Sequence, residues 1–190
     1  MKVLGIAGSP RSNGNTDMLL KEVMRGATKN GAEVNTIFLR EFSISHCLHC
    51  DNCLKDGKCN IADDMQFIYR ELESADRLVL ASPLHFMGLT SQTKSMVDRC
   101  QSLWVRKNKL NLPPLGDHRV RKGLFISVGG RRISGLFEPA LATVKALFSS
   151  LNIEYSGRLV FSGIDEKGAI KEQPDILKEA YLAGQQLTED

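Results

Sequence analysis

The sequence predicts an α/β fold in which helices cover both faces of a parallel sheet. Three observations support this class. Short apolar runs that end at Gly, Pro or Ser alternate with longer segments whose apolar residues recur at i, i+3, i+4 and i+7. The chain has 190 residues, of which 42% are hydrophobic and 25% charged, an ordinary globular composition. Five strands alternating with five helices fit one domain of this length, residues 1–190.

The apolar runs are expected to form the strands. Residues that end strands follow them, such as Pro83 after the third run and Gly129 after the fourth. Gly157 lies inside the last run and is a candidate break. In order, the expected strands cover residues 3–7, 34–39, 78–81, 124–128 and 153–161.

The segments with helical spacing are expected to form the helices. In the first of them Leu20, Val23, Met24 and Ala27 share one face, and Gly31 ends the helix. In order, the expected helices cover residues 16–30, 64–74, 91–104, 137–151 and 176–187.

Right-handed crossovers between parallel strands leave few topologies. The sequence predicts the flavodoxin-like three-layer sandwich, with strand order 2-1-3-4-5. Ligands in such sheets bind beyond the carboxyl ends of the strands, where the order reverses between strands 1 and 3. The loops after strands 1, 3 and 4 are therefore the expected site. Two long connections, 40–63 and 105–122, are further functional candidates.

Charge and hydropathy exclude other classes. The net charge of +3, from 25 Lys+Arg and 22 Asp+Glu, is too small for a dedicated nucleic-acid binder. No apolar stretch reaches the ~18 residues of a membrane span, and the run after Lys2 is too short for a signal peptide. We expect a cytoplasmic protein without a nucleic-acid or membrane partner, whose cysteines are thiols or ligands before they are disulfides.

The segment after the first strand gathers hydrogen-bond donors at the expected start of a helix. A helix N-terminus binds anions through its free N–H groups, and Arg11 can hold a phosphate through two parallel bonds. Neither Walker A nor Gly-x-Gly-x-x-Gly is present. A polar turn with one capping residue is the alternative, but one cap does not need so many donors. The predicted phosphate site comprises Ser9, Arg11, Ser12, Asn13, Gly14, Asn15 and Thr16.

The loop after the third strand mixes apolar and aromatic residues with a glycine, a lining that suits a planar aromatic ligand. Core packing is the alternative for Phe86 and Met87, and a surface position is the alternative for His85. Both alternatives weaken because this loop and the phosphate loop are expected to flank one crevice, closed on a third side by the segment after strand 4. The predicted lining comprises Pro83, Leu84, His85, Phe86, Met87, Gly88, Gly129, Gly130 and Arg131.

Four cysteines form C-x2-C-x2-C-x5-C in the long loop 40–63, a cysteine-rich insert: Cys47, Cys50, Cys53 and Cys59. Gly57 is expected to turn the chain so that Cys59 faces the other three. Consecutive x2 steps are closer to the ferredoxin run than to the separated knuckles of zinc sites, although the proline that follows the ferredoxin run is absent. Tolerated free thiols, zinc or disulfide links, and a cluster motif without its cluster are the alternatives. His46 and His49 are candidate additional ligands or hydrogen-bond donors, whereas Cys100 is expected to be a small buried hydrophobe.

These segments resemble a known family. Residues 8–16 resemble the phosphate loop of the NADPH-dependent FMN reductase-like flavoproteins, and residues 82–88 resemble their isoalloxazine loop, with His85 where a tyrosine is typical. The cysteine run followed by Asp63-Asp64-Met65 resembles the iron–sulfur flavoproteins, and Asp98-Arg99 also fits. The resemblance covers most of the chain and is weakest after Leu151. It implies FMN, a [4Fe–4S] cluster on the four cysteines, a ferredoxin-like donor and a homo-oligomer.

The stretch 106–122 is basic. The alternatives are a solvated loop, a docking patch for an acidic redox partner or a nucleotide phosphate, and part of a subunit interface. Pro113-Pro114 is expected to stiffen its centre. Against one acid, Asp117, the stretch carries Arg106, Lys107, Lys109, Arg119, Arg121 and Lys122.

We therefore expect an FMN-dependent electron-transfer oxidoreductase with a [4Fe–4S] cluster. It would pass electrons between a one-electron, ferredoxin-like donor and FMN, and on to a small acceptor. The cofactor carries the chemistry, so no catalytic side chain is expected. The first alternative is an NAD(P)H-dependent FMN or quinone reductase without a cluster. The second is a flavodoxin-like electron carrier, which the charge of +3 disfavours because such carriers are strongly acidic.

Overall fold

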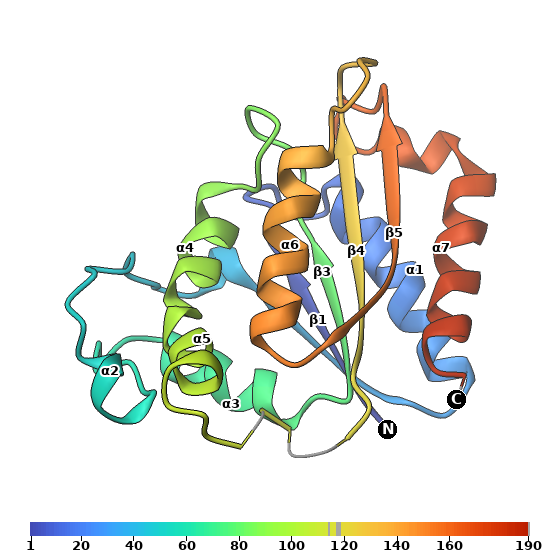
Figure 1. Cartoon of the computed structure of the whole chain (residues 1–190). Coiled ribbons are helices and arrows are strands. Elements are labelled where there is room, and N and C mark those ends of the chain that lie inside the picture. Colours follow the sequence, from blue (N-terminus) through green and yellow to red (C-terminus); the bar gives the residue numbers. More distant parts are fainter. Residues whose placement is uncertain (114, 117–118, 190) are drawn as a thin grey trace.

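The computed structural model describes residues 1–113, 115–116 and 119–189. Five parallel strands form one sheet in the order β2-β1-β3-β4-β5, which confirms the predicted topology (Figure 1). The predicted strand positions are confirmed to within a residue or two at most ends. The strands are β1 Lys2–Ala7, β2 Glu33–Phe38, β3 Arg77–Ala81, β4 Lys122–Gly129 and β5 Glu154–Ser162.

Helices cover both faces of the sheet, so the three-layer flavodoxin-like class is confirmed (Figure 1). One face packs against α1 (Asn15–Lys29) and α7 (Pro174–Leu187). The other packs against α3 (Met65–Ser74), α4 (Ser91–Arg99), α5 (Gln101–Asn108) and α6 (Glu138–Ser150). Each layer has its own buried apolar cluster, as expected for parallel strands that are buried on both sides. Three short elements were not predicted: η1 Leu39–Glu41, α2 Cys53–Asp56 and η2 Ala169–Glu172.

The helix predicted at 91–104 is two helices, α4 and α5, which meet at Cys100. The Tyr69 hydroxyl donates to the Arg99 carbonyl at 2.7 Å and takes the place of a helical N–H. The Leu103 N–H turns instead to the Cys100 carbonyl at 2.9 Å. The apolar spacing runs on through the break, and for that reason the pattern predicted one helix. Cys100 is 2% exposed, as predicted.

The last strand is continuous through Gly157, so the break considered there is wrong. Gly123 pairs with Tyr155 and Leu124 pairs with Gly157, which leaves Ser156 as the extra residue of a β-bulge. The Ser156 hydroxyl donates to the Gly123 carbonyl at 2.9 Å and closes the irregularity.

The basic stretch 106–122 is partly a structural element rather than a solvated loop. The Arg121 guanidinium is buried and donates to the carbonyls of Leu72, Ala75 and Leu151, which lie at the ends of α3 and α6. Arg119 pairs with Asp76 at 2.7 Å. Pro114 and Asp117, which entered the prediction for this stretch, lie outside the described residues.

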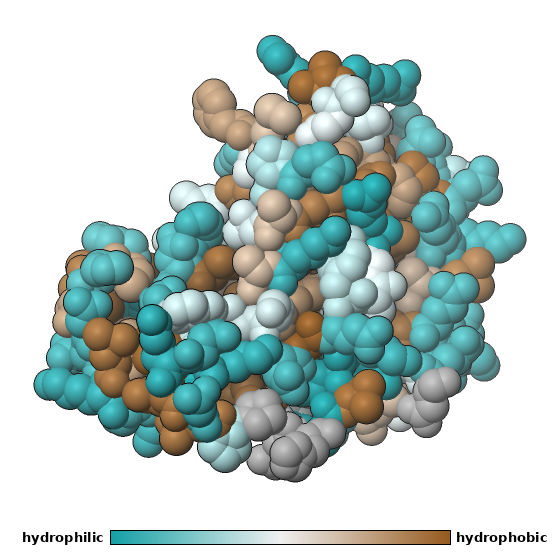
Figure 2. Space-filling view, in the orientation of Figure 1, coloured by the Kyte–Doolittle hydropathy of each residue, from teal (hydrophilic) through white to brown (hydrophobic). Residues whose placement is uncertain are grey.

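Within the described part of the chain, no helix is both long enough and apolar enough to cross a bilayer. The surface in Figure 2 mixes polar and apolar residues, and apolar atoms gather at the lower left, where Figure 1 places the cysteine loop. In that loop Leu48 is 60% and Leu54 is 47% exposed.

Candidate functional site

The three loops that the sequence singled out line one cavity at the carboxyl edge of the sheet. The predicted residues that line it are Ser9, Arg11, Gly14, Asn15, Thr16, Pro83, Leu84, His85, Gly129 and Gly130. The predicted residues that belong to the same loops but do not line it are Ser12, Asn13, Phe86, Met87, Gly88 and Arg131. A fourth wall, which the sequence analysis missed, comes from Ile164, Asp165 and Lys167 after β5.

The loop after β1 is held against the start of α4. The Thr90 hydroxyl donates to the Gly8 carbonyl at 2.6 Å and lies 2.8 Å from the Thr93 hydroxyl. The Gly8 N–H donates to the Ala81 carbonyl of β3 at 2.7 Å. A Cβ on Gly8 would lie 1.9 Å from Thr93 Oγ1, so only glycine fits. The loop therefore leaves β1 along a path set by buried threonines.

The turn that follows orders its own donors. The Arg11 N–H donates to Ser9 Oγ at 3.1 Å, and Ser9 is buried. The Asn13 N–H donates to Asp17 Oδ2 at 3.0 Å. The first helical bond of α1 runs from Met18 to Gly14, so the N–H groups of the first helical turn have no partner within the helix. The site thus offers an anion-binding N-terminus with the exposed Arg11 beside it.

An ion pair missed by the sequence analysis lies beneath this turn. Arg40 Nη1 contacts Asp17 Oδ2 at 3.0 Å and the Ser9 carbonyl at 3.4 Å. Burial raises the pKa of Asp17 above its ordinary value, although Arg40 opposes the shift. Arg40 offsets the negative charge that Asp17 brings to the first turn of α1, where an anion would bind. No local sequence pattern signals this pair, because the partners are 23 residues apart.

The loop after β3 is a tight turn. His85 and Gly88 exchange two backbone hydrogen bonds of 3.0 Å, with Phe86 and Met87 between them at φ 50° and 64°. Left-handed conformations of residues other than glycine cost about 1–2 kcal/mol each. Phe86 is 107% exposed and Met87 is 37% exposed, so the core-packing alternative for these two is wrong.

The fourth wall is attached to α1 through Asn15. Its amide Nδ2 donates to the Glu166 carbonyl at 2.9 Å, and its Oδ1 accepts from Gly168 N–H at 2.9 Å and from Ile170 N–H at 3.3 Å. Asn15 is 7% exposed. Asn15 thus lines the cavity, and its side chain fastens the loop after β5, to which the cavity residue Lys167 belongs.

The cysteine loop forms a second, separate pocket against α5. Cys47, Cys50, Cys53 and Cys59 all line it, together with Arg99 and several apolar groups. Gly57 makes the predicted turn at φ 74°, and a Cβ there would lie 2.9 Å from Arg106 Cβ. Among the described residues, no group of three His, Cys, Asp or Glu side chains is close enough to hold a metal ion. His49 lies at the surface, 3.9 Å from Asp51.

The thiols of this pocket differ in their electrostatics. Burial and the neighbouring charges of Cys59, Cys47 and Cys50 raise the pKa of Cys53. Hydrogen bonds from the backbone and side chain of Asn52 lower the pKa of Cys50. Four thiolates therefore disfavour one another here unless a positively charged centre joins them.

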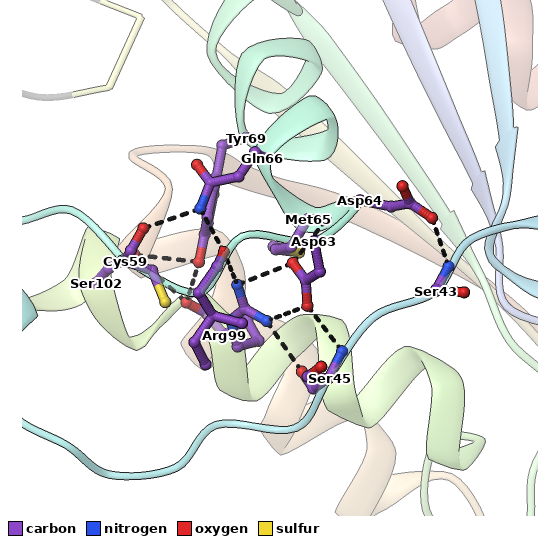
Figure 3. Close-up of polar contacts among 11 residues, drawn as sticks. Ser43, Ser45, Cys59, Asp63, Asp64, Met65, Gln66, Tyr69, Arg99 and Ser102 are labelled. Atoms are coloured by element: carbon purple, nitrogen blue, oxygen red, sulfur yellow. Dashed lines mark hydrogen bonds and ion pairs between the residues drawn. The ribbon is translucent and has the colours of Figure 1, made fainter.

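A network of polar contacts anchors the loop to its surroundings (Figure 3). Asp63 accepts from the Ser45 N–H at 2.8 Å, and Asp64 accepts from the Ser43 N–H at 2.6 Å. The Gln66 amide donates to the carbonyls of Cys59 and Ile61, both at 2.9 Å. The loop after β2 starts beside the turn of residues 9–16, which Arg40 contacts, but its cysteines lie beside the far end of α4.

Fold and cavity together define a flavodoxin-like protein with a cavity at the β1/β3 switch point. Residues 1–161 match the family model of NADPH-dependent FMN reductase. An iron–sulfur flavoprotein of Methanocaldococcus jannaschii is 39% identical over 105 residues, which span 55% of this chain and 54% of that protein. Another from the same organism is 36% identical over 149 residues, spanning 78% and 71%. A flavone reductase structure superposes with a TM-score of 0.75 at 22% identity, covering 99% of this chain and 62% of that one, which shows the fold alone.

The chain belongs to the NADPH-dependent FMN reductase family and, within it, to the iron–sulfur flavoproteins. The family is one of flavin-dependent oxidoreductases.

Proposed function

We propose that this chain is an FMN-dependent electron-transfer oxidoreductase whose flavin binds in the cavity. The FMN phosphate is assigned to the turn at residues 9–16, and the isoalloxazine ring to the side formed by Pro83, Leu84, His85 and Gly129. The single observation that carries the proposal is that these loops, far apart in sequence, line one cavity at the switch point. Family membership supports FMN as the occupant.

The residues present fit that cofactor. The unpaired N–H groups of α1 and the Arg11 guanidinium complement a phosphate dianion. Leu84 and Val128 offer apolar surface to a ring, while Gly129 and Gly130 leave backbone close to it. When bound, FMN supplies one- and two-electron redox chemistry; the chain binds it, orients it and shields one side.

We further assign a [4Fe–4S] cluster to Cys47, Cys50, Cys53 and Cys59. Four thiols in one largely apolar pocket are the donor set that such clusters require. A cluster is wider than one ion, so its ligands stand further apart than those of a single metal. Its iron would also offset the mutual repulsion of the thiolates, which adds to burial in raising the pKa of Cys53. Electrons would enter from a ferredoxin-like or NAD(P)H donor and leave to a small acceptor.

Anaerobic reconstitution with FMN, iron and sulfide tests both assignments through the absorbance spectrum and the metal content. We expect one FMN and about four iron and four sulfide per chain. Cys53→Ala should lose iron and keep FMN, whereas Arg11→Gln should weaken FMN and keep iron. Cys100→Ala, which changes the fifth cysteine, should keep both. A colourless protein that binds no FMN overturns the function.

A reductase without a cluster is the second candidate. The observation that favours it is that no group of metal ligands converges among the described residues. FMN binding with stoichiometric zinc and no sulfide, or with no metal, would select this candidate. NAD(P)H oxidation by the cluster-free protein with a quinone acceptor would then measure its activity.

A further inference from the structure

One side chain connects both ends of the cysteine loop to α4 (Figure 3). Arg99 Nη1 donates to the Ser45 carbonyl at 3.1 Å, two residues before the first cysteine. Arg99 Nη2 lies 3.4 Å from the Ile61 carbonyl, two residues after the last. The guanidinium thus closes the loop at its base, around the thirteen residues that run from Cys47 to Cys59 inclusive.

Asp63 completes this closure. Its carboxylate receives Arg99 Nη1 at 2.6 Å and Nη2 at 3.1 Å, a two-point contact that only a planar guanidinium provides. It also accepts from the N–H groups of Ser45 and Met65. The Arg99 side chain is 0% and that of Asp63 10% exposed, so solvent screens the pair little.

One donor of Arg99 is left over. Within the part of the chain that the structure describes, its Nε is buried without a hydrogen-bond acceptor. A buried donor that stays unsatisfied costs about 1–3 kcal/mol. Arg99 also lines the cysteine pocket, together with the four thiols, with apolar residues such as Leu48 and Val105, and with polar ones such as Asn60 and Gln101. None of the polar groups described there accepts from Nε, so a sulfur of a group bound by the thiolates is the acceptor that we consider.

We propose that Arg99 is the positioning residue of the cysteine site. Through Asp63, Ser45 and Ile61 it holds the loop in its ligand-binding form before any cluster is present. Through its Nε–H it donates a hydrogen bond to a sulfur of the group that the thiolates hold. The first half concerns this chain alone; the second rests on the proposed [4Fe–4S] cluster.

The test compares two ion pairs that both involve residues of α4, the buried pair Arg99–Asp63 and the exposed pair Lys94–Asp98. Arg99→Gln with Asp63→Asn removes the buried pair and leaves no uncompensated buried charge. Lys94→Gln with Asp98→Asn removes the pair at 2.6 Å whose side chains are 51% and 44% exposed, and serves as the matched control. Arg99→Lys keeps the positive charge and loses the two-point contact of the guanidinium with Asp63. FMN affinity, expected to be unchanged in all three variants, shows that each is folded.

The first readout is hydrogen exchange of the cluster-free, FMN-bound protein. Amides of residues 43–63 should exchange at least tenfold faster in the double variant without Arg99, and within twofold of wild type in the control. Amides of residues 8–16 should not change. Equal exchange of residues 43–63 in wild type and in the Arg99 variants overturns the positioning role.

The second readout is anaerobic loading with iron and sulfide. We expect loading to fall severalfold in both Arg99 variants and not in the control. The clusters that form in the double variant should have a more negative midpoint potential, because hydrogen bonds to sulfur stabilise the reduced form. An unchanged potential overturns the Nε–sulfur bond. A wild-type protein that takes up neither iron nor sulfide overturns the proposed cluster, while its exchange data still decide the positioning role.

Discussion

Thr90 and Arg99 stand at the two ends of helix α4 and each fastens a different functional loop. Thr90 donates to the Gly8 carbonyl beside the cavity at the sheet edge, and Arg99 pairs with Asp63 at the base of the cysteine loop. Helix α4 spans nine residues, about 13 Å along its axis. The helix therefore sets the spacing between the two sites within one chain, and its ends respond to different substitutions.

At the first end, Gly8→Ala is expected to destabilise the protein by about 1–3 kcal/mol through overpacking against Thr93 Oγ1. Thr93→Ala removes that oxygen, so the double variant should lose less free energy of unfolding than the two single losses added together. Urea unfolding of the four proteins measures the coupling. Strict additivity would show that the two residues do not press on one another.

At the cavity, Lys167 is expected to favour the phosphorylated flavin. Lys167→Gln should weaken FMN about 3–10-fold at low salt and leave riboflavin unchanged, because a partly screened charge contact is worth about 1 kcal/mol. Lys171→Gln, an exposed lysine that does not line the cavity, is the control. Equal weakening of both flavins by Lys167→Gln would assign the lysine to the ring or to the fold instead of the phosphate.

The buried carboxyls Asp17 and Asp63 should respond to acid in opposite directions. Burial raises the pKa of Asp17 above 3.8. The contribution of Asp17 to the free energy of unfolding is therefore present below 3.8 and is lost as the pH rises through the pKa of the folded state. Burial also opposes the ionisation of Asp63, but hydrogen bonds from Arg99, Ser45 and Met65 outweigh it and hold the pKa below 3.8. Its contribution is present above 3.8 and is lost as the pH falls through the folded pKa.

Unfolding free energies of wild type, Asp17→Asn and Asp63→Asn between about pH 6 and about pH 2.5 measure both effects. As the pH falls, the free energy of unfolding of wild type should decrease relative to that of Asp63→Asn. Over the same range it should increase relative to that of Asp17→Asn. Parallel curves for the two variants would contradict the opposite shifts.

In the cluster-free protein, Cys50 should be the first thiol to react with iodoacetamide. It is exposed, and hydrogen bonds from Asn52 lower its pKa, whereas burial raises the pKa of Cys100 to about 12. Peptide mapping after a short alkylation should find Cys50 modified and Cys100 untouched until denaturant is added. Asn52→Ala removes the side-chain hydrogen bond to Cys50 and leaves the backbone one. The pKa of Cys50 should therefore rise and its reaction should slow. Early modification of Cys100 would contradict its buried position.

The sequence predicted the features that depend on local patterns. Apolar runs predicted the five strands, crossover topology predicted their order, and the loops after β1 and β3 were correctly expected to flank one cavity. Gly57 was correctly assigned to a turn in the cysteine loop. These predictions succeed because strand periodicity, turn residues and crossover handedness are properties of neighbouring residues and of chain topology.

Other features had no local signal. Tyr69 divides the helix expected at 91–104, because its hydroxyl donates to the Arg99 carbonyl in place of a helical N–H. Arg121 binds carbonyls of helices formed elsewhere in the chain, so a residue counted toward a basic surface is part of the interior. In both cases the partner is a backbone carbonyl, which every residue possesses and which therefore leaves no mark on the sequence.

The residues alone predicted the fold class, the edge of the sheet where three loops line a cavity, and the turn that gathers the four cysteines in one pocket. Only the tertiary structure decided that Asn15 holds the loop 153 residues away, that Lys167 joins the cavity, and that Arg99 closes the cysteine loop. The physical reason is the distance along the sequence between the residues that interact. A pattern of side chains records which surfaces must be buried, whereas a single hydrogen bond between distant segments exists only once packing has brought its two atoms together.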